Sequence, residues 1–305
     1  MFQGTFTALV TPFRGGEIDE PAFRALIDEQ IEAGIDGIVP CGSTGESATL
    51  SHEEHEKVIG IAIDHARGRS SQAGRSVKVI AGTGSNNTRE ACRLTRAAAD
   101  AGADASLLIS PYYNKPTQHG HVEHFKAIAA AAPELPLILY NIPGRTGMNM
   151  LPETIARLAE VPSIVGIKEA SGSVDQWLNI IRLCGPDFCV LAGDDAATLP
   201  MMSIGAHGVI SVLTNLMPAR FKAMVDAALA GDFGSAAQIQ YEVLPLLQVL
   251  FLEINPIPVK AALAMMGRIH NEVRLPLTPL SDAPAARLRD ALRAAGLLAE
   301  ARATA

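Results

Sequence analysis

The sequence predicts an α/β fold in which eight parallel strands close into a (β/α)8 barrel, followed by a C-terminal helical appendage. Three observations support this prediction. Eight short runs rich in β-branched residues recur along the chain, helical patterns separate most of them, and the strand signals stop after Gly231. Alternating strands and helices form parallel sheets through right-handed crossovers. Eight nearly equal units close most naturally into a TIM barrel.

The predicted strands are residues 7–10, 37–41, 77–81, 105–110, 137–141, 164–168, 189–192 and 208–212. The helices between them have recognisable starts, at Asp19 before Glu20 and Pro21, at Ser51 with Glu54, at Asn87 with Glu90, and at Pro152. Gly34 and Gly102 are typical helix ends. A doubly wound open sheet is the alternative. We favour the barrel because no glycine-rich nucleotide fingerprint follows the first strand.

The barrel is expected to occupy residues 1–231 and the helical appendage residues 232–305. Helical patterns in the appendage cover residues 233–250, 258–267 and 284–298. Before the third strand, residues 67–75 are polar and contain three arginines and two glycines. This composition predicts an exposed loop at the N-terminal face of the barrel, away from the chemistry.

Composition excludes several classes of partner. The chain has 305 residues, 48% of them hydrophobic, and a net charge of -7. The sequence shows no cluster of basic residues that could bind phosphates, so a nucleic-acid partner is not expected. The apolar stretch at residues 244–252 is interrupted by Pro245 and Gln248 and is shorter than a membrane span. The first residues lack the basic and apolar segments of a secretory signal. We therefore expect a cytoplasmic protein without a membrane segment.

The cysteines show no C-x-x-C spacing; they are Cys41, Cys92, Cys184 and Cys189. Because such spacing is absent, neither a zinc site nor a disulfide framework is indicated, and we expect reduced thiols. Cys41 alone lies next to a candidate site, where a small buried thiol is favoured over a nucleophile.

The C-terminal ends of barrel strands carry the active site in this fold, and one of these ends carries a lysine. Lys168 follows the apolar residues 164–167, so its amine is expected in the barrel mouth. A partly desolvated ammonium loses its proton readily, and a neutral amine attacks ketones. The alternative is a lysine that extends to the barrel rim or pairs with Glu169.

Two other strand ends add polar groups. The turn at residues 42–46 offers two hydroxyls, two glycines and closely spaced backbone N–H groups, which suit a small carboxylate. A plain connection to the next helix is its alternative. Tyr140 can carry a phenol into the same mouth and shuttle protons if it hydrogen-bonds to Thr44. Arg145 offers a bidentate fork for a second carboxylate. Each of these side chains, taken singly, is more often structural.

Short motifs distributed along nearly the whole chain form a recognisable set. They lie at residues 8–12 (ALVTP), 42–46 (GSTGE), 81–84 (AGTG), 111–114 (PYYN), 140–146 (YNIPGRT), 166–169 (GIKE), 193–195 (GDD), 208–211 (GVIS) and 255–260 (NPIPVK). Together they resemble the dihydrodipicolinate synthase and N-acetylneuraminate lyase family. The resemblance implies a TIM barrel in which Lys168, on the sixth strand, forms an imine with pyruvate. It implies no metal or organic cofactor.

The resemblance also implies roles for residues at matching positions. Thr44, Tyr140 and Tyr113 would form a proton relay, with Tyr113 reaching into a neighbouring subunit's site. The expected assembly is therefore a homo-oligomer, a tetramer of two tight dimers. The carboxylate of pyruvate would rest on Ser43 and Thr44, and Gly193 and Ile210 would line the pocket. Ser43 departs from the threonine usual in the synthases but keeps the hydroxyl.

Arg145 separates the branches of the family. The synthases use an arginine at this position to hold the carboxylate of aspartate semialdehyde, and the sugar-acid lyases generally lack it. The resemblance therefore implies condensation of pyruvate with L-aspartate 4-semialdehyde. A lyase or hydratase-aldolase that uses another aldehyde is one alternative. A catalytically silent relative that binds pyruvate or an amino acid is another.

The histidines His52 and His55 suggest two functions, a metal site and a regulatory site. His52 and His55 are three residues apart, whereas the zinc protease pattern places its histidines four apart. A metal-dependent aldolase is disfavoured because Lys168 and Tyr140 favour the imine route. The lysine-inhibited synthases of the family bind their end product at the tight-dimer interface. Residues matching that site are Ser47, Ala48, His52, His55, Asn86, Glu90 and Tyr112. We therefore hypothesise feedback inhibition by L-lysine.

Overall fold

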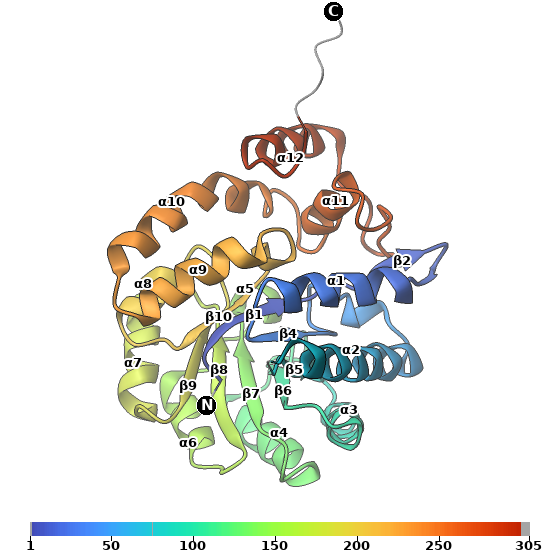
Figure 1. Ribbon diagram of the computed structural model, residues 1–305. Coiled ribbons are helices and arrows are strands. Elements are labelled where there is room, and N and C mark those ends of the chain that lie inside the picture. The colour runs from blue at the N-terminus through green and yellow to red at the C-terminus, as the bar shows by residue number, and fades with distance from the viewer. Residues whose placement is uncertain (1, 75, 300–305) are drawn as a thin grey trace, which may run out of the picture.

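The computed structural model describes residues 2–74 and 76–299, and within them parallel strands close into a barrel surrounded by helices (Figure 1). The barrel strands are β1 (Gly4–Ala8), β4 (Gly37–Val39), β5 (Lys78–Gly82), β6 (Ala105–Ile109), β7 (Leu137–Asn141), β8 (Ile164–Glu169), β9 (Cys189–Ala192) and β10 (Gly208–Ser211). Each pairs with the next barrel strand in the chain, and β10 closes on β1. The predicted (β/α)8 barrel is confirmed.

Helices follow the strands, with short 3-10 turns and one hairpin added. The helices are α1 (Glu20–Glu32), α2 (His52–Ala73), α3 (Thr88–Ala101), α4 (Gln118–Ala131), α5 (Pro143–Thr146), α6 (Pro152–Ala159), α7 (Val174–Cys184), α8 (Thr198–Ser203), α9 (Pro218–Leu229), α10 (Phe233–Val249), α11 (Ile257–Met265) and α12 (Asp282–Ala294). The 3-10 turns are η1 (Ser47–Thr49) and η2 (Leu213–Asn215). The hairpin of β2 (Phe13–Arg14) and β3 (Glu17–Ile18), which the sequence did not predict, lies outside the barrel.

Side chains of the barrel strands alternate between two apolar cores. In β7, Ile138 and Tyr140 belong to the cluster inside the barrel, whereas Leu137 and Leu139 belong to the cluster between strands and helices. Since both faces of each strand are covered, the strands are almost wholly apolar. A polar side chain on an inward position near a strand end is therefore displayed in the barrel mouth.

The helix starts predicted from capping residues are confirmed. The Asp19 carboxylate accepts from the Ala22 amide at 3.2 Å at the start of α1. Before α2, the Ser51 amide donates to Glu54 Oε2 at 2.8 Å, and the Glu54 amide donates to Ser51 Oγ at 3.2 Å. These reciprocal bonds satisfy two amides that the first helical turn leaves without a partner.

The loop expected at residues 67–75 is wrong over most of its length, because α2 continues to Ala73. Arg67 Nη2 donates to the Gly102 carbonyl at 2.5 Å, and Arg69 Nε donates to Asp28 Oδ1 at 2.7 Å. The Arg67 and Arg69 side chains therefore extend from a helix and bind the adjacent α3 and α1. Residue 75 lies outside the described residues.

The C-terminal helices α10 to α12 are present with slightly shifted bounds, and they cover one side of the barrel (Figure 1). Helix α10 packs on α8 and α9, while α11 packs on α12 and η2. Pro245 lies inside α10 without ending it. Lys260 of α11 forms an ion pair with Glu46, which follows β4, and both side chains are fully buried. The C-terminal region is thus fastened to the barrel mouth.

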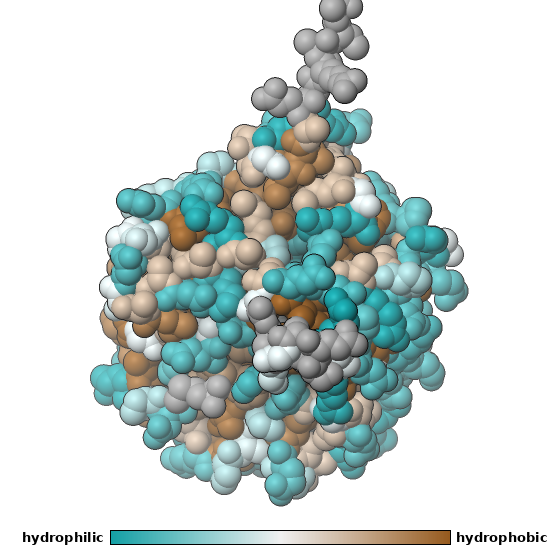
Figure 2. All heavy atoms as spheres, viewed as in Figure 1, coloured by the Kyte–Doolittle hydropathy of each residue, from teal (hydrophilic) through white to brown (hydrophobic). Residues whose placement is uncertain are grey.

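The outer surface carries hydrophilic and hydrophobic side chains interspersed with one another on the face drawn in Figure 2. Among the helices of the described residues, none has both the length and the apolar character that crossing a membrane would require.

Candidate active site

Lys168 and Tyr140 lie side by side at the C-terminal end of the barrel. They are register partners on the neighbouring parallel strands β8 and β7. Because partners in a parallel pair point to the same face of the sheet, both side chains enter the barrel mouth. The Lys168 amine lies 4.3 Å from the centroid of the Tyr140 ring, and Lys168 is only 6% exposed.

The Lys168 amine loses its proton more readily than an ordinary lysine does. Burial lowers its pKa to about 8, an effect opposed by the Asp195 carboxylate and increased by the Arg145 guanidinium. Within the described chain, no hydrogen bond or ion pair reaches this amine. The pairing of Lys168 with Glu169, weighed from the sequence, is wrong. The Glu169 carboxylate lies on the opposite face of β8 and accepts from the Asn141 amide at 3.0 Å and the Ser171 N–H at 2.6 Å.

A cavity of about 150 Å³ surrounds Lys168 and contains most of the predicted substrate site. Its lining includes Ser43, Thr44, Tyr140, Arg145, Gly193 and Ile210. Gly193 matters for a steric reason, since a Cβ there would lie 3.1 Å from Lys168 Cε and 2.8 Å from the Ala170 Cβ. Side chains at this position would therefore press on the lysine.

The turn after β4 presents free backbone donors beside the lysine. Cys41 and Glu46, which flank it, have φ values of 55° and 54° in the left-handed region. The described structure contains no acceptor for the amides of Ser43 and Thr44, whereas the amides of Glu46 and Ser47 bond back into the turn. Consecutive unpaired N–H groups form an anion-binding concavity. The turn therefore has the geometry that a small carboxylate requires.

The polar side chains of the mouth are linked differently from the direct Thr44–Tyr140 hydrogen bond considered from the sequence. Thr44 Oγ1 accepts from Asn255 Nδ2 at 2.9 Å, and Arg145 Nη2 donates to the Asn255 backbone carbonyl at 2.9 Å. No hydrogen bond joins Thr44 to Tyr140 among the described residues. Burial raises the pKa of the Tyr140 phenol, which keeps it protonated.

Asn255 and Asp195 were not among the residues singled out from the sequence. Asn255 lies between α10 and α11 in the NPIPVK motif. Asp195 lies in the GDD motif; its carboxylate accepts from the amides of Val212 and Leu213 at 3.0 and 3.1 Å, and burial raises its pKa to about 6. Motif membership was the available signal, since neither position is at the end of a predicted strand.

Tyr113 lies apart from the other proposed relay residues. Its side chain is 89% exposed and lines neither of the two cavities described here, and its backbone has a φ of 72°. The chain therefore brings Lys168, Tyr140 and Thr44 together by itself, but it does not bring Tyr113 to them.

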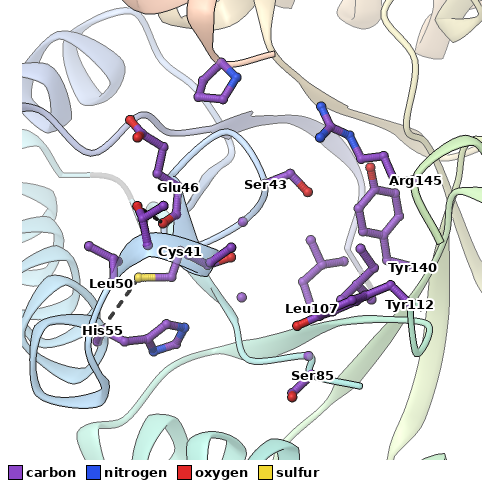
Figure 3. Close-up of a pocket in the computed structure, with 18 of the residues that line it drawn as sticks. Cys41, Ser43, Glu46, Leu50, His55, Ser85, Leu107, Tyr112, Tyr140 and Arg145 are labelled. Carbon is purple, nitrogen blue, oxygen red and sulfur yellow. Dashed lines mark hydrogen bonds between the residues drawn. The ribbon is translucent and has the colours of Figure 1, made fainter. Parts of the chain in front are cut away.

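A second cavity of about 610 Å³ adjoins the first and shares Ser43, Tyr140, Arg145 and Asn255 with it. Figure 3 shows Tyr140 and Arg145 on one side, Leu50 and His55 on the other, and Ser43 between them. Of the residues matched to a lysine-binding site, the lining includes Ser47, Ala48, His52, His55, Glu90 and Tyr112. Asn86 instead donates to the Tyr112 carbonyl at 3.1 Å.

Charged and titratable groups in the second cavity are mostly paired. His52 Nε2 lies 2.5 Å from Glu90 Oε1, and Ser85 donates to the same carboxylate. His55 is buried with Nδ1 unpartnered in the described chain, and burial lowers its pKa to about 4. Cys41 is buried, its thiol donates to the His55 carbonyl at 3.6 Å, and burial raises its pKa. This thiol is packed in the core as expected.

No cluster of three or more His, Cys, Asp or Glu side chains that could hold a metal occurs in residues 2–74 and 76–299. All four cysteines are free thiols.

Known proteins resemble the chain over nearly its full length. The model of the dihydrodipicolinate synthetase family matches residues 1–295. A 4-hydroxy-tetrahydrodipicolinate synthase of Nitratidesulfovibrio vulgaris (strain DSM 19637 / Miyazaki F) is 55% identical over 298 residues, which are 97% of this chain and 99% of the relative.

Two solved structures are also similar. One is the chloride-inhibited dihydrodipicolinate synthase from Acinetobacter baumannii complexed with pyruvate, with a TM-score of 0.93, 46% identity, and coverage of 98% of this chain and 100% of that one. The other is the DHDPS from Cyanidioschyzon merolae with lysine bound, with a TM-score of 0.93, 44% identity, and coverage of 97% and 99%.

Proposed function

The chain belongs to the dihydrodipicolinate synthetase family, and from this premise we propose that Lys168 performs the family's chemistry through an imine with pyruvate. The activity is that of a 4-hydroxy-tetrahydrodipicolinate synthase, a pyruvate-dependent lyase of lysine and diaminopimelate biosynthesis. One observation carries the proposal: the Lys168 amine is buried, unpaired in the described structure, and lowered in pKa to about 8. Such an amine is a nucleophile near neutral pH.

The pyruvate half of the reaction uses residues that line the smaller cavity. Lys168 Nζ attacks the C2 carbonyl of pyruvate, and loss of water leaves an iminium whose nitrogen withdraws electrons. A proton then leaves C3 to the relay of Tyr140, Thr44 and Tyr113, giving an enamine. The free amides of Ser43 and Thr44 support the proposal that the pyruvate carboxylate rests on this turn.

The second half of the reaction adds the aldehyde, closes the ring and releases Lys168. The enamine carbon attacks the aldehyde of L-aspartate 4-semialdehyde, and the relay returns its proton to the new alkoxide. The substrate amine then attacks C2, closes the ring and displaces the Lys168 amine, so that one water is lost overall. Arg145 would hold the semialdehyde carboxylate. Among the described residues its guanidinium makes one hydrogen bond, to the Asn255 carbonyl, and it can direct its remaining donors at the substrate.

The proposed substrates can be tested separately. After incubation with pyruvate and borohydride, mass spectrometry with peptide mapping should show one adduct, on Lys168. Lys168→Ala should lose the adduct, and Lys126→Ala, at an exposed position of α4, should keep it. An unmodified parent protein would overturn the imine. In a coupled assay, Arg145→Ala should lose semialdehyde turnover while still forming the adduct, and unaffected turnover would overturn the choice of aldehyde.

We also propose a homotetramer of two tight dimers in which Tyr113 completes the relay of a neighbouring subunit. The support is its exposure of 89%, which leaves the phenol free to contact another chain. Tyr113→Phe should lower turnover with little change in sedimentation. A fully active monomer in analytical ultracentrifugation would contradict the proposal.

Inhibition by L-lysine is proposed for the second cavity. The support is that most of the matched residues line it, and that the relative from Cyanidioschyzon merolae is described with lysine bound. Initial rates should fall with millimolar L-lysine and not with D-lysine as the matched control. Glu90→Gln, which removes the charge facing His52, should weaken inhibition. Unchanged rates in L-lysine would refute the site.

We propose a cytoplasmic location, which four free thiols support because a reducing compartment keeps thiols unpaired. Residues 1–231 are proposed as the catalytic barrel and residues 232–305 as a helical region that supports its mouth.

A further inference from the structure

Asn255 connects the two halves of the proposed site. It lies in the segment between α10 and α11, is 7% exposed, and lines both cavities. Its side-chain Nδ2 donates to Thr44 Oγ1 at 2.9 Å. Its backbone carbonyl accepts from Arg145 Nη2 at 2.9 Å. The side chain therefore acts on the pyruvate side, and the backbone acts on the aldehyde side.

The direction of the Asn255–Thr44 hydrogen bond determines what the threonine can do. A hydroxyl has one hydrogen to donate and two lone pairs to accept with. Because Asn255 Nδ2 is a donor, Thr44 Oγ1 uses a lone pair in this bond. The hydrogen of the hydroxyl is then free to be donated to another group in the cavity that Thr44 shares with Tyr140 and Lys168.

The segment that carries Asn255 is fixed against the turn that carries Thr44. Lys260, on the helix α11 that follows this segment, forms the fully buried ion pair with Glu46 at the end of that turn. The Arg274 amide donates to the second Glu46 oxygen at 3.0 Å. These contacts hold the backbone that carries Asn255 against the turn that carries Thr44.

We propose that Asn255 is a positioning residue that orients the Thr44 hydroxyl for proton transfer at C3 of pyruvate. The inference rests on the proposed imine mechanism. Asn255 contributes through its side chain, which bonds Thr44, and through its backbone carbonyl, which bonds Arg145. A substitution of the side chain removes the first bond and leaves the second, so the two contributions can be tested separately.

Asn255→Asp is the sharpest test, because a carboxylate of the same shape can only accept and turns the Thr44 hydrogen towards itself. With pyruvate alone in D2O, exchange of the C3 protons followed by NMR reports the enamine step without any aldehyde. We expect exchange to slow about 100-fold in Asn255→Asp, the lower end of what general acid–base catalysis contributes, and about tenfold in Asn255→Ala, where Thr44 keeps its hydrogen and loses its orientation. The KM for the semialdehyde should stay within about twofold of the parent value, because substitution of the side chain leaves the contact to Arg145 in place.

Two further variants calibrate the result. Arg145→Ala should show the reverse pattern, with C3 exchange reduced less than in Asn255→Asp and semialdehyde turnover lost. Asn271→Asp makes the same chemical change at an exposed position of the C-terminal region, where no described residue bonds the side chain, and should leave both quantities unchanged. Where the introduced carboxylate prevents folding, Asn255→Ala carries the test.

Exchange at the parent rate in Asn255→Asp, with the borohydride adduct on Lys168 intact, would overturn the positioning role alone. Parallel losses of exchange, of semialdehyde affinity and of the thermal midpoint would also overturn it, in favour of a merely structural role. An absence of the adduct in the parent protein would instead overturn the imine mechanism, and the positioning role with it.

Discussion

The pH dependence of imine formation offers a direct measure of the environment around Lys168. With a pKa of about 8, about 9% of the amine is neutral at pH 7, against about 0.03% for a lysine at its ordinary pKa of 10.5. The site therefore raises the reactive fraction about 300-fold. The rate of imine formation should increase about tenfold per pH unit below 8 and level off above it.

Two substitutions should move this inflection in opposite directions. Asp195→Asn removes the carboxylate that favours the Lys168 cation, so the inflection should fall below 8, and the amide oxygen can still accept from the backbone. Arg145→Leu removes a cation that disfavours it, so the inflection should rise. The measurement is the initial rate of pyruvate adduct formation from pH 6 to 10, quenched with borohydride and read by intact mass.

An inflection near pH 10 in the parent protein would refute the argument from burial, and shifts of the same sign in the two variants would refute the assignment of charges.

The pH dependence of the free energy of unfolding provides an independent check. Between pH 8 and 10.5 the unfolded chain binds more protons at Lys168 than the folded protein does. The contribution of Lys168 to the free energy of unfolding should therefore rise with pH across this window and be lost as pH falls through 8.

Three other substitutions test packing and local structure. Lys260→Met leaves the buried Glu46 carboxylate without its cation and should lower the free energy of unfolding in urea by about 3–5 kcal/mol. Adding Glu46→Gln to this variant should restore part of that loss. An equal loss in the single and the double variant would contradict the role of the ion pair. Gly193→Ala places a Cβ 3.1 Å from Lys168 Cε and 2.8 Å from the Ala170 Cβ, so it should slow adduct formation about tenfold and lower the urea midpoint, whereas a parent-like rate would show that the contact with the lysine is harmless. Ser51→Ala should cost about 1 kcal/mol in the same urea titration, and no loss would argue against its cap.

Local sequence was sufficient wherever a short segment determines its own structure. The capping box at Ser51 formed as predicted because its bonds join residues within one turn. The predicted strand at residues 137–141 matches β7, since both faces of that strand are buried and its residues are apolar and bulky. The loop expected at residues 67–75 failed because Arg67 and Arg69 bind groups on neighbouring helices, which polar composition does not reveal.

In the candidate site too, some features could be predicted from the local sequence and others depend on tertiary structure. The place of Lys168 directly after the apolar residues 164–167 predicted that its amine points into the barrel mouth, but it could not show which partner the amine has. Tertiary structure decided that Glu169 faces the outer layer and that Asp195 and Arg145 set the charge around the amine. Asn255, which lies 211 positions from Thr44, became part of the site only through folding.

The sequence by itself determined the eight-stranded periodicity, the helix starts and the lysine at the end of the sixth barrel strand, because each depends on spacing within a few residues. Only the tertiary structure decided that this lysine is desolvated, that neither it nor the Ser43 and Thr44 amides have partners among the described residues, and that the C-terminal segment holds Thr44 and Arg145. Desolvation and hydrogen-bond partners depend on chain segments that approach in space, and separation along the sequence carries no record of that approach.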